Sequence, residues 1–335
     1  MSTEAGQPPH RTEPLHVLMF YSFVSGFAGL LLDESHEHTG IDWYRAASRE
    51  KSEEFARSAS AQSELQIATA LESYIDNRVF LLDGDDPRGR VSNIIHDAIV
   101  TQNLLLVREA LSLAQGATWL SSDVDRSRQA FVDWSDTGEP PDLSTSDALQ
   151  KTEAEVFARG RPVMDRIRRL GRERAAGAWW SAPAGAGLPC TTRKLDSVTA
   201  AGLIFRDDSL GESRACAWDV HVAADAAVAE IHDVPDWQQL VAASPRLVSD
   251  SRQEEWSQRF GLPGPWFLPD WGELAGRWDG VHLSVYGYLR CQGQIAPVSD
   301  GRTVLVGWDP DATYWLRDAI TLAGTSPDRW VRDTS

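Results

Sequence analysis

The hydrophobic pattern of the chain changes near residue 179, and this change limits the folds open to it. Before this point, apolar residues recur every three or four positions over 43–82 and 91–120, as they do in amphipathic helices. After it, short apolar runs alternate with turns that contain Gly and Pro, and eleven of the fourteen tryptophans lie from Trp179 onward. We therefore expect an α+β protein, with an N-terminal helical domain followed by a mixed, mostly antiparallel, strand-rich domain.

The length of 335 residues favours two domains over one. We expect a disordered polar tail over 1–14, a helical domain over 15–178 and an α+β domain over 179–335. Pro, Ser, Thr and Asp are concentrated over 134–147, which is typical of a linker or long loop, and a further helix is expected over 148–178.

The strand-rich half shows a finer pattern of expected elements. Four apolar runs predict strands, over 190–195, 201–206, 215–223 and 227–234. Two helices, each with Pro-Asp-Trp near its start, are expected over 233–245 and 268–280. The stretch 281–316 is expected to form two strands joined by a turn, with an inner strand over 302–308.

The net charge and the cysteine content indicate which ligands and which cellular location to expect. A formal net charge of -17 argues against general nucleic-acid binding, because an acidic surface repels the phosphate backbone. Cys190, Cys216 and Cys291 are 26 and 75 residues apart, so they form no CxxC metal motif. Few cysteines and no secretory signal in the polar N-terminal stretch suit a cytoplasmic protein, which is what we expect.

One apolar segment raises the question of membrane contact. Residues 15–32 contain no Lys, Arg, Asp or Glu, and their number just reaches the length of a membrane-spanning helix. The segment also contains His16, Ser22 and Ser25, which favour a buried core helix over a membrane anchor. Contact with a membrane through 15–32 stays open as the second interpretation.

Several common catalytic motifs are absent from the sequence. It has no Gly-x-Ser-x-Gly, no P-loop, no dinucleotide-type glycine fingerprint and no His-Glu-x-x-His motif. His36 and His38 would share one face of a strand but not of a helix, and no third metal ligand is near them, so we expect no metal site. His282 and Ser284 share the polar face of a predicted strand, where a structural hydrogen bond is expected rather than catalysis.

A pair of carboxylates follows the expected strand over 302–308. Asp309 and Asp311 are two positions apart and can project into one cleft. Alternatively, one of the two carboxylates caps a helix formed by residues 312–320, and Pro310 lies in the first turn of that helix. The sequence alone leaves both interpretations open.

The C-terminal half resembles bacterial and phage proteins with an ADP-ribosyltransferase-like fold. The resemblance covers about 40% of the chain, roughly 186–318, and rests on the order of three motifs, at Pro189–Leu195, Gly202–Arg206 and Gly307–Thr313. The motifs depart from the family pattern at several points. Pro189 and Cys190 replace a His-Tyr pair, Arg206 replaces a Ser, and Asp311 replaces a Glu.

The resemblance implies that NAD is a substrate and that the nicotinamide–ribose bond is cleaved. It implies catalytic carboxylates at Asp311 and Asp309, and an acceptor that is an unknown protein or small molecule. The NAD-binding residues implied are Thr191, Thr192 and Arg193 on the first strand, Arg206 at the diphosphate, and Phe205 or Trp308 against the nicotinamide ring. Two alternatives remain: a non-catalytic binding or immunity-type protein on the same scaffold, which the motif departures favour, and an unrelated small-molecule biosynthetic enzyme.

Overall fold

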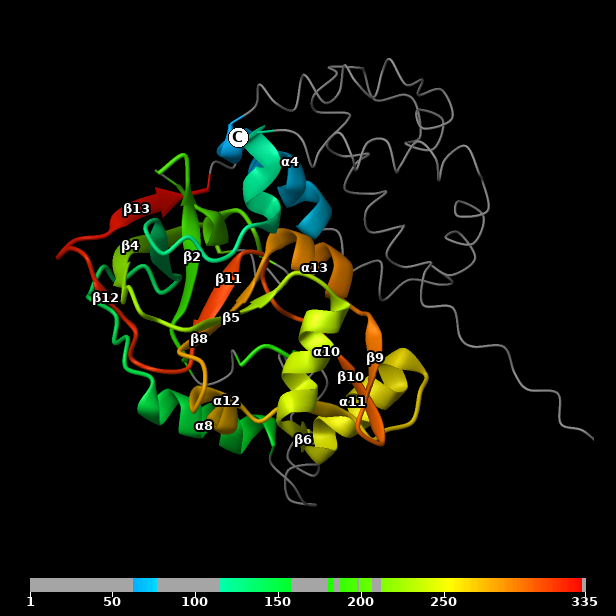
Figure 1. Cartoon of the computed structure of the whole chain (residues 1–335). Coiled ribbons are helices and arrows are strands. Elements are labelled where there is room, and N and C mark those ends of the chain that lie inside the picture. Colours follow the sequence, from blue (N-terminus) through cyan, green and yellow to red (C-terminus); the bar gives the residue numbers. More distant parts are fainter. Residues whose placement is uncertain are drawn as a thin grey trace, which may run out of the picture.

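The computed structural model describes residues 63–76, 115–157, 180–183, 187–197, 199–206 and 212–332 (Figure 1). The apolar segment 15–32, His36 and His38, and most of the expected helical domain lie outside these residues. Within that domain, the helix α4 (Glu64–Asp76) falls inside the region that the sequence predicts to be helical. Among the described residues, no helix combines the length and apolar character that crossing a membrane would require.

The described part of the chain is built around a nine-stranded, mostly antiparallel sheet, which confirms the α+β character of this region. Its main path runs β12 (Ile320–Leu322), β4 (Arg214–Val222), β1 (Gln129–Asp133), β2 (Cys190–Leu195), β11 (Ala312–Trp315), β8 (Gly280–Leu283) and β5 (Val228–Ile231). In addition, β13 (Asp328–Val331) pairs with β4, and β3 (Thr199–Ala200) pairs with β2. The pair β5–β8 at one end is parallel, whereas the other pairs are antiparallel.

Helices and two short ribbons pack around this sheet (Figure 1). The helices are α8 (Ser146–Val156), α10 (Val234–Ala243), α11 (Asp250–Phe260), α12 (Trp271–Ala275) and α13 (Val285–Cys291), with 3-10 turns at η1 (Gln115–Ser121) and η3 (Ala201–Leu203). The ribbons are β6 (Pro245–Leu247) with β7 (Phe267–Pro269), and β9 (Ile295–Val298) with β10 (Gly301–Val304). In Figure 1, α8, α10, α11 and α12 gather at the lower side of the view, next to these ribbons.

Both Pro-Asp-Trp helices are present, although α12 covers only Trp271–Ala275 of the predicted range 268–280, and their caps explain where they start. The Asp233 carboxylate accepts a hydrogen bond from the backbone N–H of Asp236 at the start of α10. Asp270 caps α12 in the same way through the N–H of Glu273. Each helix then buries its first tryptophan in the core.

The hydrophobic core lies against one face of the sheet. The apolar side chains of β5, β8 and β11 alternate toward it, as expected when one face of a strand is buried. Trp308 lies at its centre, with ring centroids 6.1 Å from Trp237, 6.3 Å from Trp271 and 5.2 Å from Tyr314. The opposite face of the same strands carries Glu230, His282 and Thr313, next to the buried Trp315, and we call it the polar face because it carries the candidate site.

Four elements differ from the sequence-based predictions, at 285–291, 201–206, 302–308 and 129–133. Residues 285–291 form the helix α13 and not a strand, because Ser284 accepts a hydrogen bond from the Gly287 N–H and starts a helix. The apolar positions of so short a run fit both periods. Residues 201–206 begin with the 3-10 turn η3 and not a strand, since the N–H of Gly202 bonds to the Thr192 hydroxyl and turns the chain across β2.

The stretch around Asp311 excludes one of the two interpretations left open there and corrects the strand expected before it. Residues 312–315 form β11, not the capped helix that was one interpretation, since β-branched and aromatic residues favour a strand and both neighbouring strands pair with it. The strand expected over 302–308 is only partly formed, as β10, and it pairs with β9 outside the main sheet. A tight turn at Ser299, with φ of 53°, joins these two strands into a hairpin.

The strand β1 comes from the part of the chain that we assigned to the helical domain. It lies between β4 and β2 and pairs with both. The main sheet therefore includes residues from both sides of position 179.

Candidate active site

The polar face of the sheet presents a row of paired side chains across four strands. Thr191 on β2 pairs with Thr313 on β11, which pairs with His282 on β8, which pairs with Glu230 on β5. Residues that lie directly opposite each other in a sheet share a face. Their side chains therefore follow one another across that face, and those of Thr191, Thr313 and His282 are buried.

A buried ion pair lies at one end of this polar face. The Arg193 Nε is 2.6 Å from Asp311 Oδ1, and the Arg193 backbone N–H donates to Asp311 Oδ2 at 2.9 Å. The two side chains are only 2% and 1% exposed. Burial alone raises the pKa of Asp311, but the charge of Arg193 and the hydrogen bonds from His282 and Arg193 outweigh it, so the pKa lies below its ordinary value.

His282 lies between two carboxylates. Its Nδ1 is 2.5 Å from Glu230 Oε2, and its Nε2 is 3.5 Å from Asp311 Oδ1. Burial lowers the pKa of His282, but the hydrogen bonds and charges of Asp311 and Glu230 outweigh it and raise the pKa to about 9. A pKa of about 9 gives His282 a positive charge at neutral pH, so its Nδ1–H donates to Glu230 while its Nε2–H faces Asp311.

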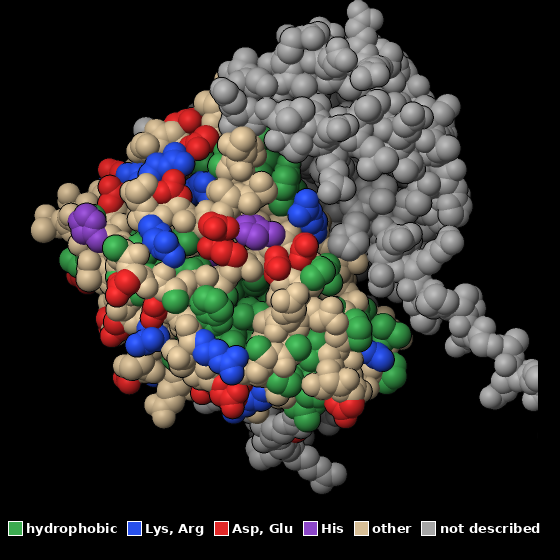
Figure 2. Space-filling model, in the orientation of Figure 1, with side chains coloured by type: hydrophobic (Ala, Val, Ile, Leu, Met, Phe, Trp, Pro, Cys, Tyr) green, Lys and Arg blue, Asp and Glu red, His purple; other side chains and the backbone are tan. Residues whose placement is uncertain are grey.

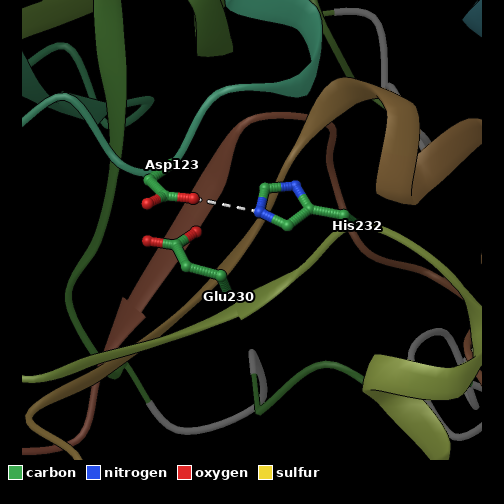
Figure 3. Close-up of side chains that lie close together, drawn as sticks. All are labelled: Asp123, Glu230 and His232. Carbon is green, nitrogen blue, oxygen red and sulfur yellow. Dashed lines mark hydrogen bonds and ion pairs between the residues drawn. The ribbon is translucent and has the colours of Figure 1, made fainter.

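Asp123, Glu230 and His232 form the part of this network that reaches solvent, and we call them the surface triad (Figure 3). One side-chain N or O atom from each lies within 4.8 Å of those of the other two. His232 Nε2 is 3.0 Å from Asp123 Oδ1, and the His232 ring is fixed on its other side by Ser284 Oγ, 2.9 Å from Nδ1. The side chains are 77% exposed for Asp123, 28% for His232 and 19% for Glu230.

The fold brings the surface triad together at the ends of two parallel strands. Glu230 lies on β5 and His232 directly follows it, while Ser284 directly follows β8. The crevice beyond the carboxyl ends of parallel strands is where α/β sheets commonly bind ligands. Figure 2 shows a histidine side chain between acidic side chains near this end of the sheet, on the face turned to the viewer.

Two charged side chains of the sheet, Arg193 and Glu230, hold the loop that carries Asp123. The Arg193 Nη2 donates to Ser122 Oγ at 2.9 Å and to the Asp123 carbonyl oxygen at 3.3 Å. On the other side, the Val124 N–H donates to Glu230 Oε1 at 3.1 Å. The position of Asp123 is therefore determined by main-chain contacts on both sides of it.

The structure brings some of the residues named by the resemblance into this network. Arg193 and Asp311 form its buried ion pair. Phe205 is buried and stacks on Trp119, with ring centroids 6.2 Å apart, and the Arg193 guanidinium lies 5.4 Å from the same Trp119 ring. The Thr191 hydroxyl lies on the polar face, where it donates to Gln129 and accepts from Trp315.

The other residues named by the resemblance lie elsewhere. Trp308 is fully buried in the core against the opposite face, and Asp309, in the turn before Asp311, is half-buried. Thr192 accepts the N–H of Gly202. Arg206 lies 3.6 Å from Glu212 and 4.5 Å from the centre of the Trp134 ring.

Glu230, His232 and Asp123 were not named from the sequence. The sequence did contain a signal for two of them. Glu230 and His232 are two positions apart at the end of an apolar strand, the same spacing that drew attention to Asp309 and Asp311. Asp123 lies in a polar loop whose residues carry no periodic pattern, so only the fold shows its place.

The surface triad has two chemical uses. Two carboxylates beside an imidazole can stabilise a positive charge and move a proton. Two carboxylate oxygens and one imidazole nitrogen are also a ligand set that divalent metals accept, and the contacts from Ser284, His282 and Val124 would orient such ligands from behind.

Comparisons of the chain with protein-family models, with curated proteins and with solved structures found no match. They therefore leave the resemblance to ADP-ribosyltransferase-like proteins untested. The function has to be inferred from the site itself.

Proposed function

We propose that the chain is an enzyme that cleaves a glycosyl bond, with the nicotinamide–ribose bond of NAD as its target. The observation that carries this proposal is the surface triad, in which two carboxylates and an imidazole lie within 4.8 Å of one another in reach of solvent. The sequence resemblance, and not the geometry, supports the choice of NAD. The acceptor is water, a protein or a small molecule.

The chemistry of this bond suits the surface triad. Cleavage passes through a state in which the ribose carries positive charge, and carboxylates about 5 Å apart stabilise or capture such a charge. The bonding electron pair leaves with the ring nitrogen, so that neutral nicotinamide departs. The acceptor oxygen then bonds to the ribose carbon, and its proton passes to His232.

Glu230 is the best-placed carboxylate for charge stabilisation. Both of its oxygens are held, one by His282 and the other by the Val124 N–H, so the carboxylate needs little reorientation during the reaction. Asp123 is more exposed and faces His232, which suits an orienting role. Asp311 lies behind them, where its carboxylate is buried against Arg193.

The direct test is release of nicotinamide from NAD by the purified protein, with and without cell lysate as a source of acceptors. We expect Glu230→Gln to lower the rate on the order of a hundredfold, as loss of an electrostatic stabiliser does. The matched control is Asp300→Asn, an exposed carboxylate on the β9–β10 turn, which should leave the rate unchanged. Circular dichroism of each variant separates loss of activity from loss of fold.

Two outcomes would redirect the proposal. Release that requires added Mn²⁺ or Zn²⁺ and stops in EDTA would assign the surface triad to metal binding. No release by the wild-type protein, together with no binding of NAD in calorimetry, would overturn the proposal and favour the non-catalytic binding protein.

A further inference from the structure

Three buried charged side chains follow the Glu230 carboxylate in a continuous series of contacts: His282, Asp311 and Arg193. We propose that they form a positioning relay, which holds Glu230 and the loop of Asp123 in the geometry that the reaction needs. This inference rests on the proposed function. The three residues act through Glu230 and Asp123 and do not touch the substrate themselves.

The contacts of the relay run without a break from one end to the other. Arg193 Nε is 2.6 Å from Asp311 Oδ1, His282 Nε2 is 3.5 Å from the same oxygen, and His282 Nδ1 is 2.5 Å from Glu230 Oε2. The charges alternate in sign along the line, and the three relay side chains are at most 2% exposed. Removing one of them would leave a neighbour as an unpaired buried charge.

The relay also reaches the surface triad by a second path. Arg193 donates to the side chain of Ser122 and to the carbonyl oxygen of Asp123, while Val124 donates to Glu230. Arg193, at one end of the relay, and Glu230, which His282 holds at the other end, therefore contact the same three-residue loop. We expect a displacement of Arg193 to move this loop, and with it Asp123 and the Val124 N–H that holds Glu230.

The backbone at Asp311 gives independent support. Asp311 has φ of 56°, a conformation that a non-glycine residue rarely adopts and that persists where the surroundings demand it. The conformation directs one carboxylate oxygen to the Arg193 side chain and the other to the Arg193 N–H. A residue without a carboxylate at this position would leave the guanidinium without its partner.

The test combines kinetics with a measurement that needs no substrate. Asp311→Asn, His282→Gln and His282→Leu are compared with the Asp300→Asn control. We expect Asp311→Asn to lower kcat about a hundredfold with little change in KM, as small displacements of catalytic groups do. His282→Gln should keep more of kcat than His282→Leu, because the glutamine amide can still donate to Glu230.

The second measurement is the proton resonance of the hydrogen bond between His282 and Glu230. It is expected far downfield and slow to exchange, since His282 is 1% exposed. It should disappear in Glu230→Gln and shift in Asp311→Asn. This readout is independent of NAD, so it tests the relay even if the wild-type protein releases no nicotinamide.

Arg193→Lys tests the relay if Asp311→Asn fails to fold. Lysine keeps a positive charge near Asp311 but lacks the second nitrogen that holds Ser122 and Asp123. We expect a lower kcat with the downfield resonance retained. The relay is overturned if Asp311→Asn or Arg193→Lys folds with unchanged kcat, or if the resonance is absent from the wild-type protein.

Discussion

Asp311 shows how a single residue can combine an unfavourable backbone with a favourable set of contacts. Its left-handed conformation costs about 1–2 kcal/mol in a residue other than glycine. The charge-assisted hydrogen bonds to Arg193 offset this cost, because bonds between charged partners are stronger than neutral ones. The sequence named both residues, but as separate contacts to a substrate. Their pairing joins positions 118 apart, which no local pattern reveals.

The pKa of His282 predicts a loss of stability at alkaline pH. It is raised from an ordinary value of 6.5 to about 9, so the contribution of the charged ring is complete below pH 6.5 and is lost as the pH rises through about 9. The lowered pKa of Asp311 acts in the opposite direction, because its contribution is present above its ordinary value of 3.8 and is lost as the pH falls below it.

Urea unfolding at a series of pH values measures this effect. We choose pH 5 to pH 10 so that the range extends at least about one unit beyond both the ordinary and the raised pKa of His282. We expect the free energy of unfolding to fall by roughly 3 kcal/mol across the upper half of this range. The decline should be much smaller in His282→Gln, and it should persist in His221→Gln, which changes an exposed histidine. An equal decline in both variants would show that other groups cause it.

Two neighbouring threonines on the polar face offer a matched pair of substitutions. The Thr191 hydroxyl is bonded to Gln129 and Trp315, whereas the buried Thr313 hydroxyl has no hydrogen-bond partner among the described residues. Thr191→Val should therefore destabilise the protein by about 1–3 kcal/mol, while Thr313→Val should be neutral or stabilising. Chemical denaturation of both variants is the measurement, and equal losses would contradict the structure.

At the scale of elements, local signals decided which predictions succeeded. The strands β2, β4 and β5 and the capped helices α10 and α12 were predicted, because their pattern and start signals lie within a few residues. The failures included α13, whose short apolar run fits two periods, and β1, whose place depends on strands that follow it much later. Among the residues of the network, the sequence named Arg193 and Asp311, which lie in motifs of the resemblance, but not Glu230, which lies outside them.

The contact between α13 and β5 predicts a strong effect for one glycine. A Cβ added at Gly287 would meet the carbonyl group of Ile231, the last residue of β5 before His232. Gly287→Ala should therefore push α13 away from the strand and cost about 1–3 kcal/mol or more. Gly324→Ala is the control, because nothing lies within 4 Å of an added Cβ there. Similar melting temperatures for the two variants would refute this packing.

At the scale of the whole molecule, the sheet depends on residues far apart in the chain. The strand β1 separates β4 from β2, and the loop just before β1 carries Asp123. The C-terminal half alone would thus lack a strand from the middle of its sheet and one residue of the surface triad.

This arrangement predicts the behaviour of fragments. A fragment of residues 179–335 should show no cooperative thermal transition, because β2 and β4 lose the neighbour that joins them. A fragment of residues 63–335 restores β1, η1 and α4 and should regain the transition. Circular dichroism and tryptophan fluorescence follow both, and a cooperative transition in the shorter fragment would show that β1 is dispensable.

The separation of Arg193 from Asp311 also has a consequence for the chain during its synthesis. The site needs Asp123 and Arg193 from early strands and loops, but their partners His282 and Asp311 are translated much later. Contacts between such distant positions form late, because a long loop must close first. A nascent chain therefore holds no complete site until Asp311 has left the ribosome. Under the proposed function, cleavage of NAD would thereby be withheld from unfinished molecules.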